Sequence, residues 1–255
     1  MDIKAALLGT IPLLAIFVIA LLIERINPAQ VQPLKSAGFN LLYTLLYALA
    51  QSAIVPLVSV ATVVAVNAAG GGWIDLPNTG WGLLLGFLLY AFTLDFMEYL
   101  FHRAQHRFPV MWAMHSFHHS DTALNATTTS RHHWAEHGIK MLTIFMLAGV
   151  IFKANSAIVG LYAAISFYNV FSHMNIRIGF GRMSFALNSP QYHRIHHSAL
   201  PEHYDCNFAG LFPIFDVLFG TYRQPRTGEF PPTGLNDKKP PSGLIDAIIW
   251  PARAK

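Results

Sequence analysis

Three long runs of apolar residues constrain this chain more than any other feature of its sequence. Ala5 to Ile23 is a run of nineteen residues bounded by Lys4 and Glu24, 39–66 is a second uncharged run, and Trp81 to Leu94 is a third. About 20 apolar residues in a helix cross a ~30 Å hydrocarbon core. Backbone amides inside a bilayer must also find their hydrogen bonds within the segment. We therefore expect three membrane-spanning helices.

The composition supports a membrane protein. Hydrophobic residues make up 53% of the chain and charged residues 12%, whereas soluble domains carry about a quarter charged residues. A cleaved signal peptide is the alternative for the first run, but such a peptide ends in small residues and this run ends in Glu24-Arg25. The net charge of +4 is spread over short basic groups, so no nucleic-acid partner is expected. A single cysteine, Cys206, excludes an internal disulfide and a thiolate metal cluster.

Two shorter apolar runs follow, at 141–152 and 157–171. As helices they reach about 18 and 22 Å, less than a full span. Flanking residues extend them, or the pair forms a hairpin that dips into the bilayer, and in both cases the chain returns to the side that it left. The expected fold is all-α and integral to the membrane. It has about four transmembrane or re-entrant helices, with a His-rich helical cap on the cytoplasmic side.

Basic residues predict the orientation. Arg25 and Lys35 lie in the first connection, the second connection has none, and Arg103 and Arg107 follow the third span. Because positive residues favour the cytoplasm, the amino terminus is expected outside and the metal site on the cytoplasmic side. The predicted organisation is 1–94 for the first transmembrane helices, 95–223 for a catalytic domain, and 224–255 for a Pro-rich tail with a possible interfacial helix.

Histidines are concentrated in the predicted catalytic domain. All thirteen lie between His102 and His203, and they form one His-x-x-x-His pair and two His-x-x-His-His triplets. Residues three or four apart share a face of a helix, so each set points one way. Eight imidazoles exceed the needs of one metal ion and suit two. The expected ligands are His102, His106, His115, His118, His119, His193, His196 and His197.

These residue types leave the metal open. Imidazole binds zinc, copper, iron and nickel, and catalytic zinc usually takes three protein ligands. Eight histidines favour two metals, or one metal with further imidazoles around it. Asp95 and Glu98 precede His102 at helical spacing and are candidates for orienting its ring through the second nitrogen. The competing interpretation is a helix end that emerges into water with solvated charges.

Two other functions compete with this interpretation. His133-x-x-Glu136-His137 fits the inverted zinc-protease signature and would make the chain a membrane zinc metallohydrolase. That hypothesis leaves the three main histidine clusters unexplained. A non-catalytic protein that binds metal or haem is the other alternative, although haem needs single histidines on facing helices and not adjacent doublets.

The histidine motifs resemble those of the fatty acid hydroxylase/sterol desaturase superfamily of integral-membrane di-iron proteins. The resemblance covers about half of the chain, from Asp95 to Tyr222. It adds His173 and His133 to the expected ligands and Glu136 to the candidates for orienting them. Trp134 stands where the family's Arg-x-His-Pro-x-Glu pattern has proline. The motifs are HRAQH, PVMWAMHSFHHSD, RHHWAE, FSHMN, SPQYHRIHHS and NFAGLFPIFDVLFGTY.

The resemblance implies an oxidoreductase that uses O₂ to hydroxylate or desaturate a C–H bond of a sterol, a fatty acyl chain or another membrane lipid. The implied cofactors are two iron ions, with zinc as a possible substitute, and O₂ is the co-substrate. The electrons come from an external donor of the reductase, ferredoxin or cytochrome type, because the sequence holds no flavin or nicotinamide fingerprint.

Overall fold

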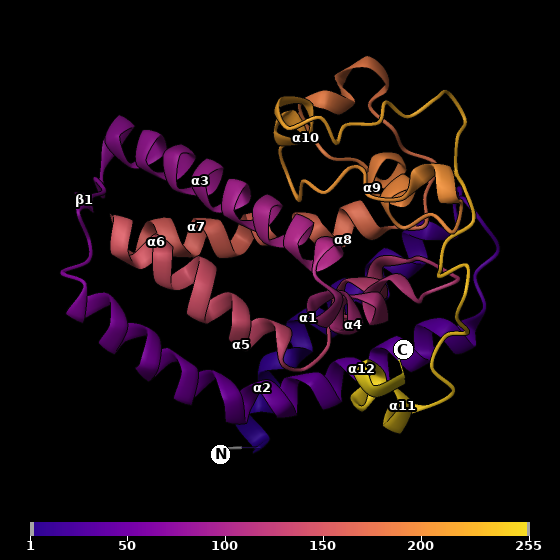
Figure 1. Cartoon of the computed structure of the whole chain (residues 1–255), viewed down its shortest axis with the longest axis horizontal. Coiled ribbons are helices and arrows are strands. Elements are labelled where there is room, and N and C mark those ends of the chain that lie inside the picture. The colour runs from indigo at the N-terminus through magenta and orange to yellow at the C-terminus, as the bar shows by residue number, and fades with distance from the viewer. Residues whose placement is uncertain (1–2, 254–255) are drawn as a thin grey trace.

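A computed structural model describes residues 3–253, and these residues are mostly helical, as predicted (Figure 1). Three long helices come first, followed by a helical hairpin and a region of short helices and loops. The helices are α1 (Ile3–Glu24), α2 (Leu34–Ala68), α3 (Gly80–Arg107), α4 (Pro109–His119), α5 (Glu136–Lys140), α6 (Met146–Ile151), α7 (Ser156–Ser166), α8 (Tyr168–His173), α9 (Pro190–His196), α10 (Ile214–Leu218), α11 (Leu244–Ile248) and α12 (Trp250–Arg253). Shorter turns are η1 (Ala126–Ser130), η2 (Met141–Phe145), η3 (Gly181–Phe185) and η4 (Pro201–His203), and the strands are β1 (Ile74–Asp75) and β2 (Phe152–Lys153).

The three predicted spans form helices that are long and apolar enough to cross a membrane: Leu7–Glu24, α2 and α3. Their apolar side chains are largely exposed, as in Leu57 at 76% and Val60 at 65%. Exposed apolar surface of this extent is expected where lipid, not water, surrounds a helix. Pro12 lies inside α1 and Pro56 lies inside α2. Proline is tolerated inside membrane-spanning helices.

The two shorter runs form a helical hairpin, and the first of them is also extended by flanking residues, from Glu136. α5, the π-helical turn η2 and α6 lead away from the histidines, and α7 and α8 lead back to them. β1, between α2 and α3, pairs in parallel with β2 at the tip of the hairpin, Ile74 with Phe152 and Asp75 with Lys153. The hairpin therefore reaches the loop that joins two of the candidate spans, and it delivers His173 to the opposite end.

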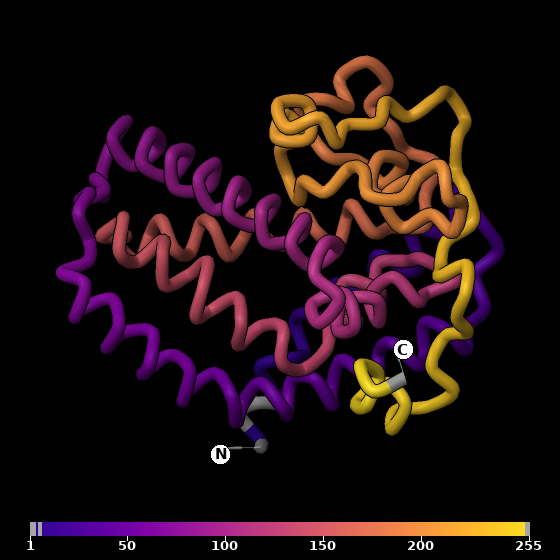
Figure 2. The backbone as a smooth tube through the Cα atoms, viewed as in Figure 1, coloured from indigo at the N-terminus to yellow at the C-terminus, as the bar shows by residue number. Residues whose placement is uncertain are grey.

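The cap is the region formed by α4, η1, α8, α9, α10 and the loops between them. It lies at the end of the molecule remote from β1 (Figures 1 and 2). Buried polar contacts fasten it to all three long helices. Glu24 of α1 accepts hydrogen bonds from the amides of Ala126 and Asn175, and Asn40 of α2 donates to Asp121. Asp95 of α3 accepts hydrogen bonds from two backbone amides of the cap.

The last segment runs back along the molecule and ends beside α2 (Figure 2). Ala247 and Trp250 are buried against Tyr43 and Phe117, and Trp250 Nε1 donates to Ser116 Oγ at 2.9 Å. The segment predicted to hold an interfacial helix contains α11, and one face of this helix packs on protein. Its other face is apolar and exposed, with Ile245 at 74%.

Candidate metal centre

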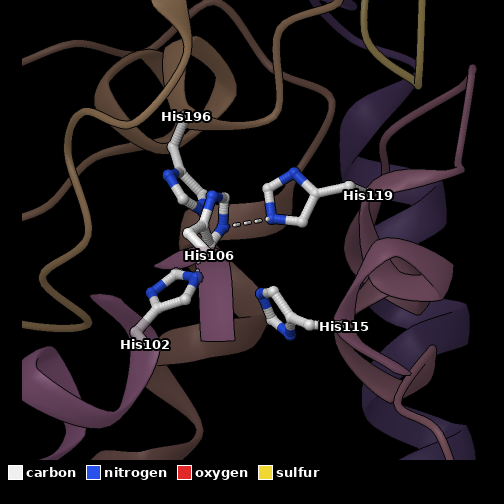
Figure 3. Close-up of side chains that lie close together, drawn as sticks. All are labelled: His102, His106, His115, His119 and His196. Atoms are coloured by element: carbon white, nitrogen blue, oxygen red, sulfur yellow. Dashed lines mark hydrogen bonds between the residues drawn. The ribbon is translucent and has the colours of Figure 1, made fainter. Parts of the chain in front are cut away.

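Five imidazoles converge at the junction of α3, α4 and α9 and form the first histidine group (Figure 3). Their ligand nitrogens lie within 4.8 Å of one another. Helical spacing of three to four residues brings both histidines of α3, and both contributed by α4, to the same side. The group is His102, His106, His115, His119 and His196.

Four further imidazoles form the second histidine group, from α4, α8 and α9. His173 Nε2 lies 3.1 Å from His118 Nε2 and 3.0 Å from His193 Nε2, and His197 Nε2 lies 3.2 Å from His193 Nε2. All four side chains are buried. The structure therefore brings together every ligand predicted from the sequence except His133.

The two histidine doublets are each divided between the groups. His119 and His196 belong to the first group, whereas their neighbours His118 and His197 belong to the second. The ring centroids of His119 and His197 are 4.4 Å apart, so the groups lie side by side. An adjacent pair of ligands directed to opposite sides is a simple way to hold two metal ions next to each other.

The hydrogen bonds of the rings show that metal ions fit this site. His102 Nδ1 lies 2.7 Å from the carbonyl of Phe208 and His196 Nδ1 lies 2.8 Å from that of Cys206. A carbonyl only accepts, so each Nδ1 carries the proton and each Nε2 exposes a lone pair. These two Nε2 atoms face each other at 3.0 Å. A cation between them removes the repulsion, and ligands ~2.1 Å from one ion at a right angle are ~3.0 Å apart.

One further ring nitrogen is without a partner. Among the described residues, His115 Nε2, opposite the Nδ1 that contacts Glu136, is buried without a hydrogen-bond partner. Buried polar atoms without partners are rare and costly, and an ion is one established reason for them. All nine side chains of the two groups are imidazoles, which zinc, copper, iron and nickel accept.

Glu136, a candidate for orienting a ligand, contacts His115 of the first group. Glu136 is buried, and its carboxylate lies 3.2 Å from His115 Nδ1 and 3.4 Å from His132 Nδ1. Gln105 donates to it at 2.7 Å. Burial disfavours its charge, yet the hydrogen bonds from His115 and His132 hold the pKa of Glu136 well below its usual range. The carboxylate stays ionised and keeps the His115 proton on Nδ1.

His132, which the sequence analysis left out, takes the place predicted for His133. The His132 ring stacks on His118 with centroids 4.6 Å apart and forms a third potential metal-binding group with His115 and Glu136. His133 instead points its Nε2 toward the carbonyl of Ile248 at 3.3 Å. Two adjacent histidines cannot be ranked by sequence, because the backbone after η1 decides which ring faces inward.

Asp95 and Glu98 contact no ligand imidazole through a hydrogen bond among the described residues. Asp95 accepts from the amides of Leu211 and Phe212 at 2.9 and 2.8 Å, so it fixes the cap and not a ring. Glu98 pairs with Lys140 at 2.6 Å. The expectation that either acid orients His102 therefore differs from the structure, in which the carbonyl of Phe208 has that role.

Sequence reasoning missed the loop from Asp205 to Phe208, which positions three ligands. Besides the carbonyls of Cys206 and Phe208, the Asp205 carboxylate lies 3.3 Å from His106 Nδ1. Asp205 and Asn207 adopt positive φ angles of 55° and 59°, which strain most L-residues. The residue types Asp205 and Asn207 were a sequence signal for this turn, because Asp and Asn are the non-glycine residues that tolerate positive φ best.

Replacing Asn207 with Ala is expected to destabilise the protein by about 2–4 kcal/mol. The change strains the backbone and leaves partners of the buried amide, such as the backbone of Arg223, unpaired. Asn207→Gly should be ~1 kcal/mol less harmful, since glycine accepts the positive φ. Thermal unfolding and metal analysis measure both effects, with Asn78→Ala in an exposed loop as control. Equal stability of the Ala and Gly variants would contradict the strain argument.

Burial keeps these imidazoles neutral. It lowers the pKa of His115 to about 4 and that of His173 to about 3, and the pKa of His118, His119 and His197 lies well below the ordinary value for the same first reason. Neutral imidazole is the form that binds metal. The cap therefore presents ligands that do not need to lose a proton near neutral pH.

Acid is expected to unfold the protein through these residues. Imidazoles of the unfolded chain bind protons below pH ~6.5, whereas the folded ones stay neutral until about pH 4 or below. The unfolded state then holds more protons, so stability falls as the pH drops from ~6.5 toward 4. Bound metal acts in the same direction. Thermal unfolding in detergent should give a melting temperature that is level from pH 8 to 7 and falls from 7 to 5; a level value at pH 5 would contradict this.

The centre is open to two cavities. One of about 270 Å³ lies between α3 and the hairpin, and it reaches His102, His115 and His173. Another of about 470 Å³ lies in the cap. It borders three other imidazoles of the first group, His106, His119 and His196, and the Trp112 side chain. The metal site is thus accessible both from the long helices and from the cap.

Comparisons with known proteins agree with this site. The family described as fatty acid hydroxylase matches residues 87–221, which is more than half of the chain. Alkylglycerol monooxygenase of Xenopus tropicalis is 32% identical over 58% of this chain and 31% of its own length. Ornithine lipid hydroxylase OlsE of Rhizobium tropici is 26% identical over 65% of this chain and 49% of its own. Protein CER1-like 1 of Arabidopsis thaliana is 30% identical over 55% and 23%. The chain therefore matches at most about half of each of these relatives, and no solved structure matches it.

Proposed function

Because the chain belongs to the fatty acid hydroxylase family, we propose that it is an integral-membrane oxidoreductase that uses O₂ to oxidise a C–H bond of a lipid. One observation carries this proposal: nine imidazoles form two adjacent groups, and five of them border a cavity that runs between apolar helices. The names of two relatives, an alkylglycerol monooxygenase and an ornithine lipid hydroxylase, support a lipid substrate. The catalytic domain is proposed to be residues 95–223.

Two iron ions are the proposed cofactors, one held by each histidine group, with zinc as a possible substitute. When bound, they would supply the activation of O₂, which no side chain of this protein can perform. The protein's own part is to hold the ligands in one arrangement. Glu136 and the carbonyls of Cys206 and Phe208 fix the tautomers of His115, His196 and His102, so that their Nε2 atoms are free for metal.

The lipid is proposed to enter from the bilayer through the smaller cavity. Ala91, Phe145 and Ile165 give this cavity apolar walls toward the long helices. Burial of the second group excludes bulk water from the far side, which protects reactive species from side reactions. The product is an alcohol or an alkene.

Electrons are proposed to come from an external reductase, ferredoxin or cytochrome, on the cytoplasmic side. The larger cavity gives such a donor access to the first group, since His106 and His119 border it. The Trp112 ring lies 4.8 Å from the His106 ring. A docked donor thus comes near the metal site without displacing the lipid.

The zinc hydrolase hypothesis has no support from the geometry. Its signature needs His133 and His137 on one metal ion, with Glu136 beside it. Neither histidine belongs to a potential metal-binding group among the described residues, and Glu136 hydrogen-bonds to His115 and His132 instead.

Metal analysis combined with lipid turnover tests the proposal. Protein purified anaerobically should contain about two irons per chain, matching the two groups. With an electron donor and a membrane-lipid extract, it should consume O₂ and yield a lipid that is heavier by one oxygen or lighter by two hydrogens. Lipid profiles of cells with and without the gene identify the substrate. Stoichiometric haem, one tight zinc, or metal and lipid binding without O₂ consumption would contradict the proposal.

A further inference from the structure

The smaller cavity has charged walls as well as apolar ones. Five ligands close one end of it, from both histidine groups: His102, His115, His118, His173 and His193. α3 forms one side with Ala91, Asp95 and Glu98, and the hairpin forms another with His137 and Lys140. The lining of this cavity therefore suits an amphipathic molecule better than a simple hydrocarbon chain.

The polar and apolar parts follow a definite order along α3. At 1.5 Å per residue, Glu98 lies about 6 Å from His102 along the helix axis, and Ala91 lies about 16 Å from it. The Tyr162 ring, which also lines the cavity, packs on Tyr90 with centroids 5.6 Å apart, so it belongs to the Ala91 end. The charged residues thus lie next to the histidines, and the apolar residues lie deeper among the long helices.

Glu98 and Lys140 form an ion pair within this wall. Their charged atoms are 2.6 Å apart, and each side chain is 23% exposed. An ammonium has three donors and a carboxylate about four acceptor sites, so the contact between them leaves further hydrogen-bonding capacity. Glu98 lies within a candidate membrane span, where ionisable residues are costly and usually mark a functional site. The two charges cancel, so a head group without net charge matches them best.

We propose that Glu98 and Lys140 bind the polar head group of the lipid substrate, with the apolar chain extending toward Ala91. The inference rests on the proposed function and adds the substrate's orientation and class. The substrate is a lipid whose head group has no net charge and both donates and accepts hydrogen bonds. A chain that entered with its methyl end first would pass the ion pair. The oxidised carbon therefore lies within a few bonds of the head group.

Photo-crosslinking tests the orientation without any turnover. The full-length, iron-loaded protein in lipid nanodiscs receives an alkylglycerol, a phosphatidylethanolamine or a phosphatidylglycerol. Each lipid carries a diazirine either at carbon 3 of the chain or at the terminal carbon. The carbon-3 probe should label residues beside Glu98 and Lys140, and the terminal probe should label residues beside Ala91 and Tyr162. The opposite assignment would overturn the proposal, as would preferred labelling by the anionic phosphatidylglycerol.

Two variants test the ion pair itself. Lys140→Met and Glu98→Gln should lower carbon-3 labelling about tenfold, the loss expected when a hydrogen bond to a charged group is removed. Lys140→Arg, which keeps the positive charge, should retain most of the carbon-3 labelling. The matched controls are Lys153→Met and Asp75→Asn, which break an exposed pair at the tip of the hairpin and should change nothing. If Lys140→Met fails to fold, the isosteric Glu98→Gln decides. Unchanged labelling in a folded variant overturns the proposal.

The outcomes for orientation and for function are separable. Correct labelling by a protein that never consumes O₂ would leave the head-group site in place and remove the proposed function. An oxidised lipid whose new hydroxyl lies near the chain terminus would keep the function and overturn the orientation.

Discussion

Removing one histidine of a doublet is expected to remove one metal ion and all of the activity. His118 and His119 are adjacent, but they belong to different histidine groups. His118→Ala and His119→Ala should therefore each lower bound iron from about two ions per chain to about one, and the double variant should bind almost none. Loss of a direct ligand should exceed the ~10–100-fold effect of losing an outer hydrogen-bond partner. Elemental analysis and O₂ consumption measure both quantities.

His203→Ala is the control for this experiment. His203 is buried like the ligands, but its ring bonds to Ser198 and lies near Glu229, away from both groups. The His203→Ala protein should be less stable than the unchanged protein but should keep both iron ions. Complete loss of iron in both single variants would show that the two groups act as one site, and full iron in either would remove that residue from the ligands.

Replacing Glu136 with Gln is expected to lower metal affinity and activity about 10–100-fold. The amide keeps the shape of the carboxylate but loses the negative charge that two imidazole rings share. It also presents an N–H group that competes with the His115 proton. Competition with a chelator measures the affinity, and Mössbauer spectra of the iron-loaded protein report whether the ligand field has changed.

Glu229→Gln provides the comparison for Glu136. Glu229 is a partly exposed carboxylate that pairs with Arg223 at 2.8 Å, outside the metal groups. It should leave iron affinity and spectra unchanged. If Glu136→Gln binds iron normally but loses all activity, then Glu136 acts in catalysis and not in positioning His115.

Local sequence patterns are sufficient to predict the long helices and the type of metal ligand. Apolar runs near 20 residues long indicate spans whatever surrounds them, and α1 to α3 confirm this. Histidines three or four residues apart face one way because the helix repeats every 3.6 residues. Both are local properties, encoded by neighbours along the chain. They were enough to predict a helical membrane fold and eight of the imidazoles that converge, whereas the family was predicted from the resemblance of the histidine motifs.

Tertiary structure decided how those imidazoles are used. His102 and His196 meet across 94 positions of sequence, and no local rule assigns His118 to one group and His119 to the other. The choice of His132 over His133, the ring contacts of the Asp205–Phe208 loop and the Glu98–Lys140 pair have the same origin. Each depends on which segment packs against which, because a side chain's direction is set by local backbone but its partner is set by the fold.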